Sequence, residues 1–401
     1  MDKRKYRPAT LAVRGGQERS PHGEASEPIY TTAAFTYDSP ETAAARFAGS
    51  DEGFVYSRYG NPTTRAFENR LRLLEGAEDC RSTASGMAAV SSSLFSWLRQ
   101  GDHVVAARAL FGSCRHILES ILPRFGVECT LIDGARLDAW REAIRPETVA
   151  FFFESPSNPL LELVDISGVA EIAREATRSG RARGRIRVML DNVFATPVLQ
   201  RPLEHGADVV IYSATKHIDG QGRVLGGAVL GDMEYIDGEL QPFLRNTGPA
   251  MSPFNAWVLL KSLETMELRV HRQCDSAEKI CDWLAEQKSV ERLYYPYHRS
   301  HPQFELARKQ MARGSTLVSF ELRGGHDAAF AFQRALELVD ISNNLGDARS
   351  IITHPATTTH SKIGNDARRE LGISDGAMRL SVGLEDVDDL IDDLGQALGR
   401  I

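Results

Sequence analysis

The stretch between Ala207 and Leu230 limits the possible folds of this chain more than any other part of it. A β-branched run at residues 209–211 is typical of a buried strand. Two hydroxyl residues and a lysine follow, Ser213, Thr215 and Lys216, and a glycine-rich passage then leads into a second apolar run. A lysine held at the end of a buried strand can be partly desolvated, which lowers its pKa and makes the neutral amine a nucleophile. The alternative is a lysine whose stem extends into water, and this stretch by itself favours that alternative.

The length and composition predict a large globular protein. The 401 residues, 42% of them hydrophobic, provide a sizeable core, so we expect two domains or one large α/β domain with an appendage. The 47 basic and 54 acidic residues give a net charge of −7, which argues against a nucleic-acid partner.

Three further features predict a cytoplasmic protein without membrane contact. There is no apolar run of about 18 residues, so we expect no transmembrane helix. The basic residues 1–7 lead into no apolar stretch and therefore do not indicate a secretory signal. The five cysteines are odd in number and lack CxxC spacing, which predicts reduced thiols rather than disulfides or a zinc site.

From residue 103 onward, apolar runs alternate with helical patterns, as in a wound α/β domain. We expect strands at 103–107, 127–132, 149–153 and 188–190, and helices at 113–122, 137–143 and 167–179. Polar residues follow the strand ends: Asn158, Asp191, Ser213, Thr215 and Lys216. Ligands of open parallel sheets bind at that edge. This convergence therefore favours a chemical role for Lys216 over the alternative of a lysine that extends into water.

The first 60 residues show no sustained periodicity but are rich in aromatic residues, which a free tail seldom carries. We interpret them as an extended arm that lies on another surface, such as a neighbouring subunit, with a helix only at 41–48. A helix over residues 62–75 follows, opened by a proline and closed by a glycine. Just before it, Tyr56 and Arg58 either bind an anion or belong to a solvated turn, and both interpretations stay open.

Another helix is predicted to open at Ser85-Gly86-Met87 and to run to about residue 98. Ser85 can cap it, and a glycine at the helix mouth lets backbone N–H groups approach a phosphate closely. Many helices begin in this way without binding a ligand, so the motif alone is weak.

The pattern changes after about residue 250. One long helix is predicted from residue 252 to about 285 as a link between domains, and a small α+β domain follows it. We therefore divide the chain into an arm (1–60), a main domain (61–250) and a C-terminal domain (251–401). Arg379 lies in a late strand, where the sequence alone favours a pair with a neighbouring carboxylate.

A strand-end aspartate and a lysine twenty-five residues later, Asp191 and Lys216, match the chemistry of pyridoxal phosphate. The lysine forms a Schiff base with the aldehyde, and a carboxylate keeps the pyridine nitrogen protonated so that the ring accepts electrons. Hydroxyl groups and a helix N-terminus hold the phosphate. We identify no metal-binding set and no serine–histidine–acid arrangement, since the histidines are scattered.

The chain resembles the pyridoxal-phosphate enzymes of cysteine and methionine metabolism, which have the aspartate-aminotransferase-like fold (fold type I). The resemblance covers nearly the whole chain and rests on Tyr56-Ser-Arg58, Ser85-Gly86-Met87, Ser155-Pro-Ser-Asn158-Pro, Asp191-Asn192, Ser213-Ala-Thr215-Lys216, Thr353-His-Pro-Ala-Thr-Thr and Arg379-Leu-Ser-Val-Gly-Leu-Glu-Asp. It implies an α/β fold with a mostly parallel sheet flanked by helices. Residues 61–250 are then the cofactor-binding domain and residues 251–401 a smaller α+β domain.

The resemblance also implies cofactor contacts. Lys216 is then the Schiff-base lysine and the base that moves protons, Asp191 pairs with the pyridinium nitrogen, and Asn158 lies near the 3′ oxygen of the ring. The groups expected to hold the phosphate are Gly86, Met87, Ser213 and Thr215.

In the family, residues matching Tyr56 and Arg58 reach the phosphate of the adjacent subunit. This implies an obligate homodimer, usually paired into a homotetramer, whose active sites are shared between subunits. By the same resemblance, Arg379 binds the α-carboxylate of an amino-acid substrate through two parallel hydrogen bonds.

Two departures from the family pattern narrow the choice of reaction. Many relatives place a tyrosine over the cofactor ring, but the matching residue here is Phe111, whose ring can stack and cannot carry a proton. Cystathionine enzymes often have a glutamate where this chain has Asn343, so a carboxylate suited to a distal ammonium is missing. We include Asn344 of the same segment among the substrate-binding candidates. Together with residues 219–223, these features are most similar to O-succinylhomoserine sulfhydrylases.

The predicted reaction is γ-replacement, in which sulfide or a thiol displaces the acyloxy group of an O-acylated homoserine. With O-succinylhomoserine and sulfide, the products are homocysteine and succinate, in methionine biosynthesis. A cystathionine γ-synthase, a γ-lyase or another γ-substitution enzyme is the alternative within the family. A non-catalytic scaffold that keeps the fold is the alternative of another class. The acyl leaving group and the nucleophile stay open.

Overall fold

The computed structural model describes residues 6–401, so residues 1–5 of the basic N-terminal segment lie outside it. The chain divides into two compact units, which we describe separately. The first contains residues 6–97, Ile211–Thr215 and Arg223–Thr265; the second contains Leu98–Val210, Lys216–Gly222 and Met266–Ile401. The domain boundaries expected near residues 60 and 250 stay predictions.

The first unit is built around α3 (Pro62–Glu75), which has the predicted bounds. The side chain of Asn61 accepts the Thr63 N–H at 2.8 Å, and Gly76 ends the helix with φ of 87°. Strand β1 (Asp79–Thr83) pairs antiparallel with β7 (Gly227–Gly231). The other helices of this unit are α1 (Pro8–Arg14), α2 (Pro40–Ala48), α4 (Gly86–Trp97), α9 (Met233–Tyr235), α10 (Gln241–Thr247) and α11 (Pro253–Leu263).

The prediction that only residues 41–48 of the N-terminal segment are helical was wrong, because α1 forms as well. Leu11 in this helix is 4% exposed, and the carbonyl of Gly15 at its end accepts a hydrogen bond from Arg70 Nε at 2.9 Å. The first part of the arm therefore packs on α3 of its own chain. A seven-residue helix has too few periodic positions to be recognised from its sequence alone.

The single helix predicted from residue 252 to 285 is two helices, α11 and α12 (Met266–Ala285). The Leu260 carbonyl, which would accept the Glu264 N–H in a continuous helix, accepts instead from buried Arg70 at 3.4 Å. The Glu264 N–H turns to the Lys261 carbonyl at 3.3 Å. A side chain from α3 thus ends α11.

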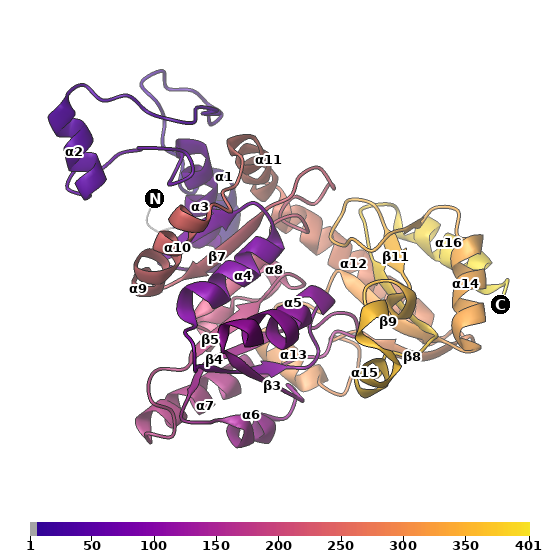
Figure 1. Cartoon of the computed structure of the whole chain (residues 1–401). Helices are drawn as coiled ribbons and strands as arrows, with labels where there is room; N and C mark the ends of the chain where they lie inside the picture. Colours follow the sequence, from indigo (N-terminus) through magenta and orange to yellow (C-terminus); the bar gives the residue numbers. More distant parts are fainter. Residues whose placement is uncertain (1–5) are drawn as a thin grey trace. The chain divides into compact units, whose positions relative to one another are not determined.

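In the second unit, four parallel strands form the order β5–β4–β2–β3, with bounds Arg187–Asp191, Thr148–Glu154, His103–Ala107 and Glu128–Ile132. Helices α6 (Leu137–Ala143) and α7 (Ile166–Arg178) lie on one side of these strands (Figure 1). Between them is a core centred on Trp140, Phe151 and Phe153. The expected wound α/β pattern is present.

The rest of the second unit is a smaller sheet in the order β10–β11–β12–β9–β8. Its strands are β8 (Val290–Tyr294), β9 (Leu317–Leu322), β10 (Asp340–Ile341), β11 (Ile351–Thr353) and β12 (Ala377–Ser381). Helix α12 packs against it together with α14 (Gly325–Ala335) and α16 (Val387–Leu398) around one apolar core. The short helices of this unit are α5 (Gly112–His116), α8 (Thr196–Leu199), α13 (Phe304–Gln310) and α15 (Asn365–Glu370).

Strand β6 (Val209–Ser213) carries the chain from the second unit into the first. The chain returns to the second unit at Lys216, one peptide bond after Thr215. The stretch that most constrains the fold thus contains several of the peptide bonds at which the chain passes between the two units.

Candidate active site

Lys216 lies three residues after the last residue of β6, close to the strand end as predicted, and is partly buried. Its Nζ donates a hydrogen bond to Oδ1 of Asn344. Burial, followed by the positive charge of Arg379, lowers the pKa of Lys216 to about 8, and the carboxylate of Asp191 opposes that change. A substantial fraction of the amine is therefore neutral near pH 8, as a nucleophile requires.

Asp191 ends β5 beside Glu154, its register partner at the end of β4. Asp191 accepts the Val193 N–H at 3.0 Å, and both carboxyl groups are buried. Burial raises the pKa of Asp191, and burial together with the negative charge of Asp191 raises that of Glu154. Two buried carboxyl groups favour a cationic ligand between or beside them, and a protonated pyridine nitrogen is such a cation.

The sequence prediction missed Glu154, which holds two of the predicted residues in place. Its Oε1 accepts the Phe111 N–H at 2.6 Å, and its Oε2 accepts the Asn158 N–H at 3.3 Å. The available indication in the sequence was its position: a carboxylate at the end of an apolar strand, like Asp191. Glu154 thus holds the backbone at Phe111, after β2, and at Asn158, after β4.

Arg379 lies in β12 and is 2% exposed, and its side chain joins these residues to the Lys216 contact. One terminal nitrogen donates to Oδ1 of Asn158 at 2.8 Å, and the other donates to the carbonyls of Asn343 and Asn344 at 3.0 and 3.1 Å. Its Nε has no hydrogen-bond partner among the described residues. Lys216, Asn344, Arg379, Asn158, Glu154 and Phe111 therefore form one connected chain of contacts.

The expectation that Arg379 pairs with a neighbouring carboxylate was wrong. Its acceptors are an amide and two carbonyls, and no ion pair to it forms within residues 6–401. Burial lowers its pKa to about 10, which leaves the guanidinium charged at neutral pH. A buried cation with one free N–H and no anion is matched by the carboxylate of a small ligand.

In the first unit, the start of α4 and Ser213 form a narrow cradle. The Ser85 hydroxyl accepts the Ala88 N–H at 3.1 Å and caps the helix. A Cβ added to Gly86 would lie 2.6 Å from the Ser213 hydroxyl oxygen, so only glycine allows this approach. The first N–H groups of a helix have no partner within the helix, and Gly86, at the start of α4, lies beside that hydroxyl.

Thr215 completes the local structure of this cradle. Its hydroxyl exchanges hydrogen bonds with the backbone of Gly226, accepting from the N–H at 3.1 Å and donating to the carbonyl at 3.3 Å. The glycine-rich passage is thereby tied back to the turn that carries Lys216. Helix N–H groups and a nearby hydroxyl suit a phosphate.

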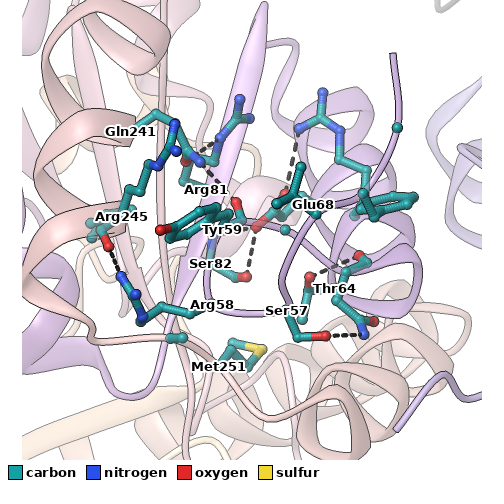
Figure 2. A pocket seen from close by; sticks show the side chains of 18 of the residues that line it. Ser57, Arg58, Tyr59, Thr64, Glu68, Arg81, Ser82, Gln241, Arg245 and Met251 are labelled. Carbon is teal, nitrogen blue, oxygen red and sulfur yellow. Dashed lines mark hydrogen bonds and ion pairs between the residues drawn. The ribbon is translucent and has the colours of Figure 1, made fainter. Parts of the chain in front are cut away.

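Arg58 lines a separate pocket of about 540 Å³ in the first unit, shown in Figure 2. Its guanidinium carbon lies 4.8 Å from the ring centre of Tyr59, and that of Arg245 lies 4.1 Å from the same ring. Arg58 also donates to the Arg245 carbonyl. Neither arginine forms an ion pair among the described residues, so both can meet an anion. Tyr56 is 40% exposed, with its ring 5.5 Å from the Arg58 guanidinium.

A metal site is the alternative use of the buried carboxyl pair. The Sγ of Cys114 and one oxygen each of Glu154 and Asp191 lie within 4.8 Å of one another. Burial raises the pKa of the Cys114 thiol well above its usual value, so it stays protonated and is a poor ligand. The hydrogen bonds from Phe111 and Asn158 also occupy Glu154, so the cluster fits an organic cation better than a metal.

Comparison with known proteins places this site in a family. Residues 9–399 match the family described as Cys/Met metabolism PLP-dependent enzymes. The chain belongs to this family. The predicted cofactor, pyridoxal phosphate, is confirmed with it, as is the prediction that the chain is an enzyme.

Relatives of two activities resemble the chain over nearly their whole length. It is 54% identical to the O-succinylhomoserine sulfhydrylase of Mycobacterium tuberculosis over 396 residues, 97% of this chain and 95% of that protein. It is 48% identical to that of Pseudomonas aeruginosa over 392 residues, 98% and 95% of the two chains. It is 42% identical to L-methionine gamma-lyase of Pseudomonas putida over 392 residues, 97% and 96% of the two chains.

A solved structure supports the fold. The metB protein of Corynebacterium glutamicum is 33% identical, and the superposition covers 100% of this chain and 99% of that one with a TM-score of 0.93. The predicted fold class, an α/β fold of type I with a smaller sheet domain, is confirmed. No helix among the described residues is long and apolar enough to span a membrane.

Proposed function

We propose that the chain transfers the homoserine carbon skeleton of O-succinylhomoserine to sulfide, producing homocysteine and succinate in methionine biosynthesis. The observation that carries this proposal is the 54% and 48% identity to two O-succinylhomoserine sulfhydrylases over almost the whole chain. A connected set of contacts supports it, formed by Lys216, Asn344, Arg379 and Asn158. These contacts bring together the Lys216 amine and the Arg379 guanidinium, which can bind a substrate carboxylate.

In this proposal, each residue has one task. Arg379 binds the substrate α-carboxylate through Nε and its terminal nitrogens. The cofactor, when bound, takes up the electron pair that deprotonation leaves on the substrate carbons. Asp191 keeps its ring nitrogen protonated, and Ser213, Thr215 and the N–H groups of Gly86 and Met87 hold its phosphate.

Lys216 moves the protons. Its amine removes a proton from Cα and then one from Cβ, after which the Cγ–O bond breaks and succinate leaves. Sulfide adds at Cγ, and Lys216 returns protons to Cβ and Cα. Phe111 has no ionisable group, so it contributes only stacking and carries none of these protons.

The direct test is the product formed by the purified enzyme with pyridoxal phosphate. We expect homocysteine from O-succinylhomoserine and sulfide, at a higher kcat/KM than from O-acetylhomoserine. If cysteine supports turnover and sulfide does not, the protein is a cystathionine γ-synthase. Absence of any visible cofactor absorbance would instead support a non-catalytic scaffold.

A γ-lyase is the second candidate, favoured by the 42% identity to an L-methionine gamma-lyase. In a lyase, water replaces sulfide as the final reactant, and the products are the γ-leaving group (methanethiol from methionine), a keto acid and ammonia. Release of 2-oxobutanoate from methionine at a rate matching γ-replacement would favour this alternative. Asn343, in place of the glutamate that cystathionine enzymes often have, argues against cystathionine as a substrate.

We also propose a cytoplasmic homodimer or homotetramer with shared active sites. The five cysteines form no disulfide with one another, consistent with a reducing compartment. The free charge of Arg58 beside Tyr59 supports the idea that this pocket meets an anion supplied by another subunit.

A further inference from the structure

A second pocket lies in the second unit, with a volume of about 1070 Å³. Phe111, Asn343 and Thr353 line it, and each of them connects it to the contact chain of the active site. Asn343 accepts a hydrogen bond from Arg379, and Thr353 is the register partner of Arg379 on the neighbouring strand. The pocket therefore begins where the substrate α-carboxylate is proposed to bind. We call it the side pocket.

The two walls of the side pocket are held close together. A Cβ added to Gly112, at the start of α5, would lie 3.3 Å from the Thr359 carbonyl oxygen. The hydroxyls of Thr353 and Thr358 are 2.8 Å apart and tie the second wall to β11. Thr359, three residues before Lys362, thus lies against the start of α5.

The charges of the side pocket do not balance. Arg115 and Glu119 form a two-pronged ion pair, with distances of 2.9 and 3.0 Å, and so neutralise each other. Lys362 also lines the pocket, is exposed, and forms no ion pair among the described residues. One positive charge is therefore left over in a pocket that is otherwise lined mainly by hydroxyl groups and isoleucines.

The side pocket also has an apolar wall. Ile341 lines it and is 62% exposed, and Ile363 lies next to Lys362 in the same lining. A ligand that fits has a short apolar segment ending in an anion. Methylene groups would contact the isoleucines, and a terminal carboxylate would meet the free ammonium group.

We propose that Lys362 binds the terminal carboxylate of the acyl group in a dicarboxylate monoester of homoserine, and that the side pocket thereby selects O-succinylhomoserine over O-acetylhomoserine. This inference rests on the proposed function. Arg115 on the facing wall is neutralised by Glu119, so Lys362 carries the free positive charge. An acetyl group has no carboxylate and gains nothing from Lys362.

The test compares both esters with sulfide as the only nucleophile. Because sulfide has no carboxylate, any effect of charge belongs to the ester and not to a thiol partner. Lys362→Met is expected to raise KM for O-succinylhomoserine five- to tenfold and to change KM for O-acetylhomoserine less than twofold. Lys362→Arg keeps the charge, so its preference for O-succinylhomoserine over O-acetylhomoserine is expected to lie within about twofold of that of the unaltered enzyme.

A second variant is expected to change KM for O-succinylhomoserine in the opposite direction. Glu119→Gln removes the negative charge that neutralises Arg115, so KM for O-succinylhomoserine is expected to fall two- to threefold, with no change for O-acetylhomoserine. Equal changes for both esters, or an unchanged preference in Lys362→Met, would overturn the proposal. Lys362 is exposed, so its replacement does not disturb the core.

An error in the proposed function can be distinguished from an error in this inference. If the unaltered enzyme forms no homocysteine from either ester, the proposed function is wrong, and calorimetry of ester binding then decides the side pocket. Tighter binding of O-succinylhomoserine than of O-acetylhomoserine, lost in Lys362→Met, would still support the inference. Equal binding of the two esters would refute it.

Discussion

At the scale of single residues, Lys216 carries the chemistry because its surroundings change its pKa. Burial and the charge of Arg379 outweigh the opposite effect of Asp191, and the pKa falls to about 8. An ordinary surface lysine, with a pKa near 10.4, is almost fully protonated at that pH. The neutral amine that attacks the cofactor aldehyde is therefore available at moderate pH only in this environment.

We predict that the cofactor-free enzyme takes up pyridoxal phosphate faster as pH rises. The neutral fraction of Lys216 increases through its pKa of about 8, so the observed rate should climb between pH 6.5 and 9 and level off above that. Stopped-flow absorbance in the visible range measures it. Lys216→Ala should bind pyridoxal phosphate without the visible absorption band of the Schiff base, and its turnover should fall at least a hundredfold. Lys279→Ala, the control, should behave as the unaltered enzyme. A rate that rises only above pH 10 would contradict the lowered pKa.

At the scale of the structural elements, ends of helices and strands supply most of the site. Asp191 and Glu154 end neighbouring strands, and Gly86 begins α4 against Ser213. Element ends expose backbone groups that need partners, and they also place side chains beyond the packed layer. Small changes at these ends should therefore affect ligand binding more than folding.

Gly86→Ala tests the cradle at the start of α4. The added Cβ would approach the Ser213 Cβ to 2.5 Å, so Ser213 or the helix start must shift, and the affinity for pyridoxal phosphate should fall at least tenfold. Fluorescence titration of the cofactor-free enzyme measures it. Gly238→Ala is the control, because a Cβ there meets nothing within 4 Å. An unchanged affinity in Gly86→Ala would show that the cradle does not hold the phosphate.

A second test at this scale concerns buried Arg70, which links three segments of the first unit. It donates to the Gly15 carbonyl, to the Leu260 carbonyl and to the carboxylate of Glu27. Arg70→Met leaves both carbonyls and the Oε1 of that carboxylate without their donor, so the free energy of unfolding should fall by about 3 kcal/mol. Urea denaturation measures the loss.

Arg72→Met on the same helix is the control for Arg70→Met. Arg72 is partly exposed and bonds locally to Asn69 at 3.0 Å, so its loss should cost no more than about 0.5 kcal/mol. Equal destabilisation by the two variants would mean that Arg70 does not fasten the N-terminal segment and α11.

At the scale of the whole molecule, the proposed sharing of active sites explains why Arg58 remains free in one chain. Its pocket holds two arginines on one tyrosine ring and no carboxylate pairs with either of them among the described residues. A cluster of unpaired cations is unfavourable unless an anion neutralises it. A phosphate from another subunit would do so.

Mixed oligomers test this sharing. Arg58→Ala and Lys216→Ala should each be strongly impaired, but in a mixed dimer one site combines an intact Lys216 with an intact Arg58 from the other chain. Random mixing of the two variants should therefore restore about one quarter of full activity. Activity no higher than the mean of the two separate variants would contradict a shared site.

The sequence by itself determined the features that depend on neighbours in the chain. The bounds of α3 follow from a proline, a periodic apolar face and a closing glycine, all within fifteen residues. The strand-end positions of Asp191 and Lys216 follow from the apolar runs before them. Such patterns are local because helix and strand propensities, caps and turns act over a few residues.

Only the tertiary structure decided features that depend on distant residues. Arg70 ends α11 although 190 positions separate it from Leu260, and Arg379 bonds to Asn158 across 221 positions. Glu154 acquires its role from the Phe111 N–H, and the pKa of Lys216 falls because of burial. Desolvation and long-range hydrogen bonds arise only when the chain is packed, so no local pattern encodes them.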